Sequence, residues 1–268
     1  MPSLPFPCAS QPLSAAGFLS ATTRLGIDAA TLWAMLQVET AGFGCLPDRR
    51  PQILFERHIF SGLTGGRFDA SNPDISNPVA GGYGPGGAAQ YGRLAEAVGC
   101  DQDAALQSAS WGLGQVMGEN FAVAGYASVE DMVTAMCASE DGQLSAVVGF
   151  IVSHKLAASL QAKDWTNYAL HYNGPSYAKN HYDTRLAAAY TRLSDGPLPD
   201  LNVRTAQACL EFLGYSPNGI DGVLGLNTLT ALHNFQAKAG LALTVGIDAG
   251  VVAALVAALP AAVDLTMP

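Results

Sequence analysis

Charged residues are scarce in this chain, and basic residues are the scarcer kind. Of its 268 residues only 13% are charged, and 13 Lys and Arg stand against 22 Asp and Glu, which gives a net charge of −9. This balance argues against a protein that holds nucleic acid or anionic lipid through a broad basic surface. The sequence therefore predicts no nucleic-acid partner.

Long apolar runs and paired cysteines are also missing. No stretch approaches the roughly 20 apolar residues that a membrane-spanning helix needs, so we expect no membrane span. The five cysteines are scattered without a C-x-x-C pair, which predicts reduced packing residues. The first basic residue is Arg24, so the charged region of a secretory signal peptide is absent, and we expect synthesis in the cytoplasm without ordinary secretion.

The residues that are abundant indicate a globular and mostly helical protein. Hydrophobic residues make up 49% of the chain, with Ala and Leu frequent throughout. Two prolines and a glycine at 195–200 break helix formation. We therefore predict a mainly α chain with one domain at 1–195, a linker at 196–200 and a second domain at 201–268. The second domain should contain three short helices near 203–213, 227–239 and 248–259.

Within the first domain, further helical patterns cover 93–108, 128–139 and 142–160. We expect a helix hairpin around Asp141 and Gly142. The residues 62–92 are rich in Gly, Pro, Asn and Ser, which predicts a long loop, while Ile53 to Phe55 could form a strand or a buried turn.

A glutamate shares the apolar face of a predicted helix. Leu32, Met35, Leu36 and Glu39 stand at i, i+3, i+4 and i+7, which is one face of a helix with 3.6 residues per turn. The pattern predicts that Glu39 faces inward. The alternative is that Glu39 merely ends the helix and points into solvent, as most glutamates do.

The predicted ends of this helix place Glu39 in its last turn. Asp28 is the predicted N-cap and Gly42 the predicted C′ residue. Apolar neighbours and the negative end of the helix dipole both favour the protonated carboxyl and raise its pKa. A carboxyl that stays protonated near neutral pH can serve as a general acid.

Two other segments combine turn residues with polar side chains. In Ser110-Trp-Gly-Leu-Gly-Gln115 two glycines let the backbone approach a ligand closely, next to a polar amide. In His171-Tyr-Asn-Gly-Pro175 a helix end presents an aromatic ring and an amide together, which is typical of carbohydrate contacts. Each segment could equally be a packed turn with no ligand.

The order of three motifs resembles the lysozyme and lytic-transglycosylase superfamily: Glu39-Thr40, Gly112-Leu-Gly-Gln115 and Tyr172-Asn-Gly174. Thr40 departs from the serine that is common there but retains a hydroxyl. More narrowly, residues 20–192 resemble the N-acetylmuramidase family of phage endolysins. The segments that carry this second resemblance are Ile53-Leu-Phe-Glu-Arg-His58, Arg67-Phe-Asp-Ala70, Ser110-Trp-Gly-Leu-Gly-Gln-Val-Met117 and Tyr172-Asn-Gly-Pro-Ser-Tyr-Ala-Lys179.

The resemblance implies a lysozyme-like helical catalytic domain. It further implies that Glu39 is the general acid that protonates the glycosidic oxygen of the β-1,4 bond between N-acetylmuramic acid and N-acetylglucosamine. Five residues would line the glycan cleft, namely Ser110, Trp111, Gln115, Tyr172 and Asn173.

Residues 201–259 resemble the small three-helix peptidoglycan-binding module. The matching residues are Ile220-Asp-Gly-Val-Leu-Gly225, Thr228, Ala231 and Phe235-Gln236. The Asp221-Gly222 turn should set the loop between two helices, and Leu229, Leu232 and Phe235 should line the core. The segment 242–246 is less regular than the family pattern and could alter the ligand groove.

Glycoside hydrolysis usually needs a second carboxylate, about 5 Å from the acid in a retaining enzyme or about 6.5–9.5 Å away in an inverting one. We favour Glu56 over Asp48, Asp69 and Asp74. Alternatively, Glu56 pairs with Arg57 and has a structural role only.

The histidines do not indicate a metal site. His58, His171 and His181 lack HExxH spacing, and no cysteines cluster near them. We predict no metal and no cofactor.

The leading hypothesis is a peptidoglycan hydrolase, specifically a muramidase, that binds bacterial peptidoglycan and is a monomer. It would act on the cell wall in the periplasm, either as a phage endolysin or as a delivered bacteriolytic effector. One alternative is a lytic transglycosylase, which forms 1,6-anhydro products. The other is a wall-binding protein without catalytic activity.

Overall fold

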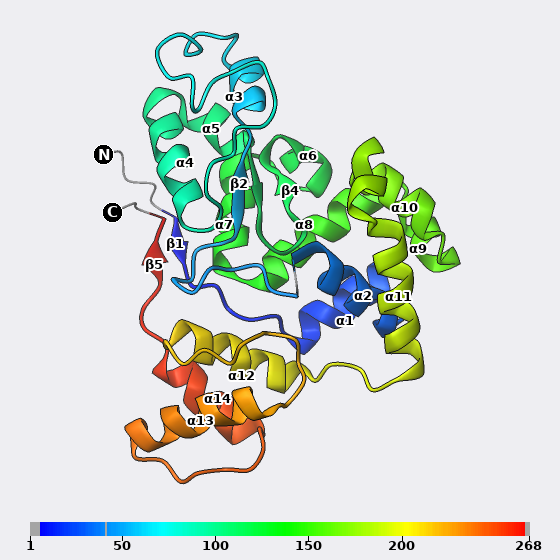
Figure 1. Ribbon diagram of the computed structural model, residues 1–268, viewed down its shortest axis with the longest axis vertical. Helices are drawn as coiled ribbons and strands as arrows, with labels where there is room; N and C mark the ends of the chain where they lie inside the picture. The colour runs from blue at the N-terminus through cyan, green and yellow to red at the C-terminus, as the bar shows by residue number, and fades with distance from the viewer. Residues whose placement is uncertain (1–5, 41, 266–268) are drawn as a thin grey trace. The chain divides into compact units, whose positions relative to one another are not determined.

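The computed structural model describes residues 6–40 and 42–265, and most of them are helical (Figure 1). The predicted mainly α fold is confirmed. The chain divides into two compact units, and each combines segments that are distant in sequence. The first unit holds the described parts of Met1–Gln11, Gly44–His154 and Ala262–Pro268, and the second holds those of Pro12–Phe43 and Lys155–Ala261. The predicted domain boundaries at 195 and 201 stay a prediction.

The described part of the first unit contains two small sheets. β2 (Ile53–Phe55), β3 (Ala109–Trp111) and β4 (Val116–Met117) form an antiparallel sheet in that order, with Leu54 opposite Ser110. Ile53 to Phe55 is therefore a strand. β1 (Pro7–Cys8) pairs with β5 (Val263–Asp264).

Helices of the first unit lie around the sheet that contains β2 and β4 (Figure 1). The described α-helices are α3 (Arg57–Leu63), α4 (Ala89–Cys100), α5 (Gln102–Gln107), α6 (Phe121–Ala124), α7 (Val129–Ala138) and α8 (Glu140–Ser153). Two 3-10 turns, η1 (Gly112–Gly114) and η2 (Gly118–Asn120), flank β4. The Gly- and Pro-rich stretch after α3 contains turns and bends, as expected for a long loop.

The junction of α7 and α8 differs from the prediction. The turn lies at Ser139, whose backbone is extended and whose Oγ accepts a hydrogen bond from the Gly142 N–H at 3.1 Å. Ser139 therefore acts as the N-cap of α8, and Asp141 and Gly142 belong to the first turn of that helix. The predicted helix hairpin is present, since α7 packs against α8, but its turn lies at Ser139 because the serine cap begins the second helix earlier.

A buried amide holds the loop that contains the two glycines. Gln143 of α8 is fully buried, and its Oε1 accepts a hydrogen bond from the Leu113 N–H at 2.8 Å. Gly112 has a φ of +66°, and a Cβ there would lie 2.7 Å from the Gln143 side chain. Gly112 is therefore required by the packing of the protein's own core. The sequence had suggested that this glycine lets the backbone approach a ligand.

The second unit brings together helices from both parts of the chain. Its elements are α1 (Ala15–Leu25), α2 (Ala29–Thr40), α9 (Ala157–Ala162), α10 (Trp165–Tyr172), η3 (Pro175–Asn180), α11 (Tyr182–Asp195), α12 (Leu201–Phe212), α13 (Leu226–Ala239) and α14 (Ala249–Ala258). Within this unit α2 lies beside α11 (Figure 1).

Both predicted ends of the Glu39 helix, α2, are confirmed. Asp28 Oδ1 accepts a hydrogen bond from the Thr31 N–H at 2.7 Å, as an N-cap residue does. Gly42 has a φ of +88°, and its N–H donates to the Leu36 carbonyl at 2.9 Å. Glu39 therefore lies in the last turn of α2.

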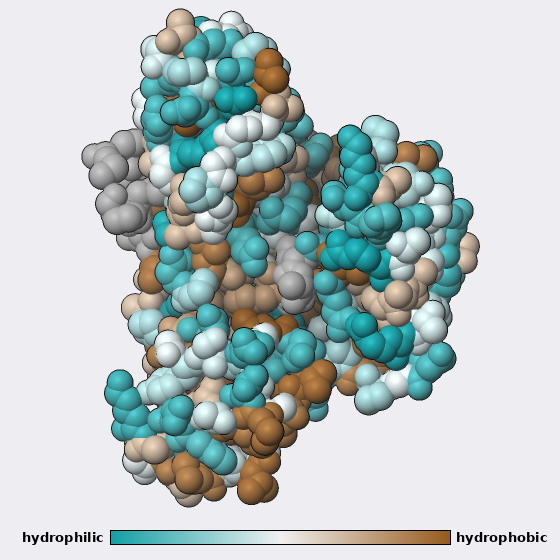
Figure 2. Space-filling model, in the orientation of Figure 1, coloured by the Kyte–Doolittle hydropathy of each residue, from teal (hydrophilic) through white to brown (hydrophobic). Residues whose placement is uncertain are grey.

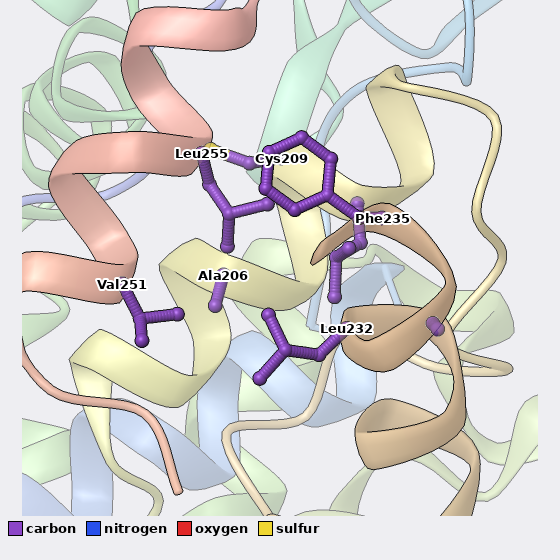
Figure 3. Close-up of a cluster of buried hydrophobic side chains, with 8 residues drawn as sticks. Ala206, Cys209, Leu232, Phe235, Val251 and Leu255 are labelled. Atoms are coloured by element: carbon purple, nitrogen blue, oxygen red, sulfur yellow. The ribbon is translucent and has the colours of Figure 1, made fainter. Parts of the chain in front are cut away.

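Helices α12, α13 and α14 form a bundle, the C-terminal bundle (residues 201–258), around a core of their own (Figure 3). Leu232 and Phe235 belong to this core as predicted, whereas Leu229 is half-buried and lies outside it. The core residues are Ala206, Cys209, Leu210, Ala231, Leu232, Phe235, Val251 and Leu255.

A second buried amide fixes the Asp221-Gly222 turn of this bundle. Gln207 Oε1 accepts hydrogen bonds from the N–H groups of Asp221 and Gly222, at 3.0 and 2.8 Å. Its Nε2 donates to Asp221 Oδ1 at 3.0 Å and to Thr228 Oγ1 at 3.1 Å. The turn that the sequence predicted is therefore held by a side chain from α12.

We expect Gly142→Ala to destabilise the protein. The new Cβ would lie 2.2 Å from the Ala135 carbonyl oxygen, so the free energy of unfolding should fall by about 1–3 kcal/mol. Gly92→Ala in α4 is the matched control, because a Cβ there meets nothing within 4 Å and helix propensity favours Ala by up to about 1 kcal/mol. Urea denaturation measures both variants, and equal effects would contradict this packing argument.

Candidate active site

Glu39 has a carboxyl group with few hydrogen bonds. The residue is half-buried, and its Oε1 is shielded from solvent with no hydrogen-bond partner in the described part of the chain. Its Oε2 accepts one long hydrogen bond from Asn173 Nδ2, at 3.5 Å. The inward orientation that the helical pattern predicts is therefore found.

Tyrosine side chains of α10 and α11 make up the surroundings of Glu39. The rings of Tyr168 and Tyr172 stack with their centroids 5.1 Å apart. Burial, followed by the nearby Glu39 carboxylate, raises the pKa of Tyr172 and of Tyr182. For Tyr168, burial, then Tyr172 and then Glu39 raise the pKa. Glu39 is thus close enough to three tyrosine side chains to influence their pKa values.

These surroundings raise the pKa of Glu39 from 4.5 to about 7. Burial is the largest cause, while the hydrogen bond from Asn173 and the charge of Arg185 act in the opposite direction. The predicted direction is confirmed, and burial is one of its two predicted causes. Near neutral pH a large fraction of the molecules therefore carries a proton on Glu39, which is what a general acid requires.

Arg185 is a charged neighbour that the sequence did not reveal. Its Nη2 donates a hydrogen bond to the Val38 carbonyl at 3.1 Å, beside the last turn of α2. The guanidinium thus lies at the negative end of this helix and close to Glu39. No spacing motif links Arg185 to Glu39, because the two residues meet only when α11 packs against α2.

Asn173 has a different orientation from the one we expected. The predicted turn is present, since Asn173 follows the end of α10 and Gly174 has a φ of +77°. The amide, however, donates to the Glu39 carboxyl, and Tyr172 is half-buried against Tyr168. The structure thus brings Tyr172 and Asn173 to Glu39.

Three other candidate residues lie around β3 in the first unit. Ser110 Oγ donates to Gln115 Oε1 at 2.9 Å, and Gln115 Nε2 donates to the Gly112 carbonyl at 2.9 Å. Trp111 is fully buried, and its indole N–H donates to the Leu106 carbonyl at 3.0 Å. The Trp111 ring belongs to the core, so a contact between this residue and glycan would have to come from its backbone.

Glu56 immediately precedes α3 in the same unit. Its Oε2 lies 3.2 Å from His58 Nδ1, and its side chain is 16% exposed. Arg57 was the partner that the alternative prediction gave to Glu56. Its Nε instead donates a hydrogen bond to the Val79 carbonyl at 3.2 Å. Burial and the nearby Glu56 raise the pKa of Tyr83, so Glu56 also faces that phenol.

Two of the weaker candidates for the second carboxylate have structural partners. Asp48 forms an ion pair with Arg50 at 2.6 Å. Asp69 accepts hydrogen bonds from Ser61 at 3.1 Å and from Ser76 at 2.6 Å. The candidates therefore form two sets: Glu39, Tyr172 and Asn173 in the second unit, and Glu56, Ser110, Trp111 and Gln115 in the first.

The C-terminal bundle has two adjoining hollows, with volumes of about 330 and 400 Å³, that share Asn218 and Asn227. Most of the side chains that line the smaller hollow carry an amide or a hydroxyl group. The exposed aliphatic residues Val223 and Leu226 line the larger one. Figure 2 shows hydrophobic side chains on the surface of this bundle. Exposed apolar side chains next to polar groups are typical of a binding surface.

Two family models match this chain, one over roughly its N-terminal two thirds and one over most of the remainder. Residues 28–194 match the family model described as N-acetylmuramidase. The chain belongs to the N-acetylmuramidase family. Residues 199–255 match the model described as a putative peptidoglycan binding domain.

A solved structure similar to this muramidase is the crystal structure of the Burkholderia AP3 phage endolysin. The two chains are 40% identical and superpose with a TM-score of 0.65, over 69% of this chain and 73% of that one. No curated protein matches the chain.

The muramidase is therefore a glycoside hydrolase that acts on peptidoglycan, and it carries a peptidoglycan-binding domain. The resemblance drawn from the sequence is confirmed. Among the described residues, none of the helices is long and apolar enough to cross a membrane.

The stability of the muramidase should depend on pH through Glu39. The folded pKa is about 7 and the ordinary value is 4.5, so this carboxyl contributes stability below pH 4.5 that is lost as the pH rises through 7. Glu39→Gln remains neutral and avoids this loss. The variant should therefore be more stable than the wild type at pH 8, by on the order of 3 kcal/mol, and the advantage should disappear at pH 4.

Thermal unfolding of both proteins at pH 4 and pH 8 measures this difference. The substitution alters the same hydrogen bond from Asn173 at either pH, so the change between the two conditions isolates ionisation. A stability difference that is the same at both pH values would contradict the raised pKa.

Proposed function

We propose that Glu39 is the general acid of this muramidase and protonates the glycosidic oxygen between N-acetylmuramic acid and N-acetylglucosamine. The observation that carries the proposal is a shielded Oε1, without a hydrogen-bond partner among the described residues, on a carboxyl whose pKa is about 7. Such a group holds a proton near neutral pH and has a free oxygen from which to deliver it.

Asn173 and Arg185 oppose the effect of burial on the pKa of Glu39. When the proton leaves, the carboxylate keeps the Asn173 hydrogen bond and the positive charge of Arg185. Both neighbours lower the pKa and thus make the proton easier to give up. A general acid is most effective when its pKa is near the working pH, and the opposing effects keep Glu39 in that range.

We further propose Glu56 as the second carboxylate, with His58 as its positioning partner. Ser110, Gln115, Tyr172, Asn173 and the backbone of Trp111 are proposed to contact glycan. These glycan contacts follow the motifs of the family, whereas Glu56 is our choice among the carboxylates of the chain.

The C-terminal bundle is proposed to bind the wall through its two hollows. Amide and hydroxyl groups there can form hydrogen bonds with the sugars and peptides of peptidoglycan. Attachment to the polymer would raise the local substrate concentration. The division into a catalytic domain at 1–195 and a binding domain at 201–268 belongs to this proposal.

In the cell, we propose that the muramidase is a phage endolysin or a delivered bacteriolytic effector. The similarity to the AP3 phage endolysin supports the first role. Synthesis in the cytoplasm, action in the periplasm and a monomeric state stay predictions.

Digestion of purified peptidoglycan by the wild type and by Glu39→Gln tests the chemistry. Because Gln cannot donate a proton as the acid does, the rate should fall by about 10²–10⁴-fold. Mass spectrometry with and without borohydride reduction identifies the products, and only the wild type should release reducible muramic-acid ends.

Two further variants complete the experiment. Glu56→Gln should also lose most activity, whereas Glu119→Gln, at an exposed position, should retain it. Anhydro ends from the wild type would make the enzyme a lytic transglycosylase. Full activity of Glu39→Gln would refute the assigned acid, and release by no variant, the wild type included, would favour a wall-binding role.

A further inference from the structure

Arg204 is a fully buried charged residue in the first turn of α12, at the start of the C-terminal bundle. Its Nε donates a hydrogen bond to the Gly42 carbonyl at 3.1 Å, and its Nη2 donates to the same oxygen. Gly42 follows the helix that carries Glu39, and both residues belong to the same compact unit as the bundle. A side chain of the bundle thus holds the segment just after the candidate acid.

Two other contacts hold the same segment. The ring of Phe43 lies 5.6 Å from the ring of Phe212 in α12. A Cβ on Gly42 would lie 3.2 Å from the Ile220 carbonyl oxygen, so the backbone of the bundle also comes close to Gly42. Gly42 and Phe43, which follow α2, are therefore held by a guanidinium, an aromatic ring and a neighbouring backbone.

This arrangement suits a positioning role. Burying a guanidinium costs free energy unless its N–H groups find hydrogen-bond acceptors. The hydrogen bonds from Arg204 to the Gly42 carbonyl are therefore strongly favoured once α12 packs against the segment after α2. The carbonyl groups near the end of a helix carry partial negative charge, which makes them good acceptors for a cation. A reacting group displaced by about 1 Å can lose about 10²-fold in rate.

We propose that Arg204 is a positioning residue for the reaction, and that it holds the end of α2 so that Glu39 keeps its place among the tyrosines. The C-terminal bundle is then a structural part of the catalytic centre in addition to a wall anchor. This inference rests on the proposed role of Glu39 as the general acid.

An anchor and a positioning element have different kinetic effects. Loss of an anchor weakens binding to the insoluble wall and leaves the turnover of a small soluble substrate unchanged. Loss of a positioning contact lowers kcat on that soluble substrate and leaves wall binding unchanged. The two roles can therefore be separated in the full chain.

The experiment compares the wild type with Arg204→Met and Arg204→Lys. Their substrate is a soluble tetrasaccharide of alternating N-acetylglucosamine and N-acetylmuramic acid. Arg204→Met, which lacks the donors, should lower kcat by about tenfold to a hundredfold with little change in KM. Arg204→Lys retains a charged donor and should recover most of the loss. In Arg204→Met the basic limb of the kcat profile should also move to lower pH, because water that reaches Glu39 reduces the effect of burial.

Controls separate this effect from a general loss of structure. Arg192→Met removes another arginine that contacts α2, since Arg192 donates to Gln37, and it should leave kcat unchanged. Binding to insoluble peptidoglycan, measured in a Glu39→Gln background to prevent digestion, should be the same with and without Arg204→Met.

Unchanged kcat and an unchanged pH profile in Arg204→Met would overturn the inference, as would a defect confined to wall binding. If Arg204→Met does not fold, Phe212→Leu loosens the same segment through Phe43, and wild-type kcat with a wild-type pH profile in that variant would overturn it equally. Activity that survives Glu39→Gln would instead refute the proposed acid, so the two failures are distinguishable.

Discussion

The desolvation of one carboxyl group, that of Glu39, determines what the second unit can do. The last turn of α2 places this carboxyl beside tyrosines of α10 and α11, where one oxygen has no hydrogen-bond partner among the described residues. Such burial is unfavourable for an anion, and the pKa rises to about 7. The chemistry proposed for the muramidase depends on this energetic cost, because a fully solvated glutamate would be ionised at neutral pH.

The loops that carry the family motifs are held by buried polar side chains of neighbouring helices. Gln143 binds the backbone of the loop that contains Gly112, and Gln207 binds the turn at Asp221 and Gly222. A buried amide must find partners for its donors and acceptor, so it fixes a loop more specifically than apolar packing does. Arg204 plays the same part at the end of α2.

The sequence predicted those features that depend on neighbouring residues. The helix of Glu39, its caps at Asp28 and Gly42, and the turn after Tyr172 follow from spacing and from local turn chemistry. The family motifs pointed to the peptidoglycan hydrolase that the comparisons confirm. The contributions of Arg185, Gln143 and Gln207 could not be predicted, because each meets its partner only through tertiary packing. The core position of the Trp111 ring was missed for the same reason, since an aromatic residue in a motif has the same letter whether it faces substrate or the interior.

A direct titration of Glu39 tests the central claim most sharply. The chemical shift of its side-chain carboxyl carbon, followed by ¹³C NMR from pH 3 to pH 10 and assigned by comparison with Glu39→Gln, reports the protonation of this group alone. We predict a midpoint near the value of about 7 that burial produces. A midpoint at the ordinary value of 4.5 would show that the carboxyl is solvated and would contradict its proposed role as a general acid.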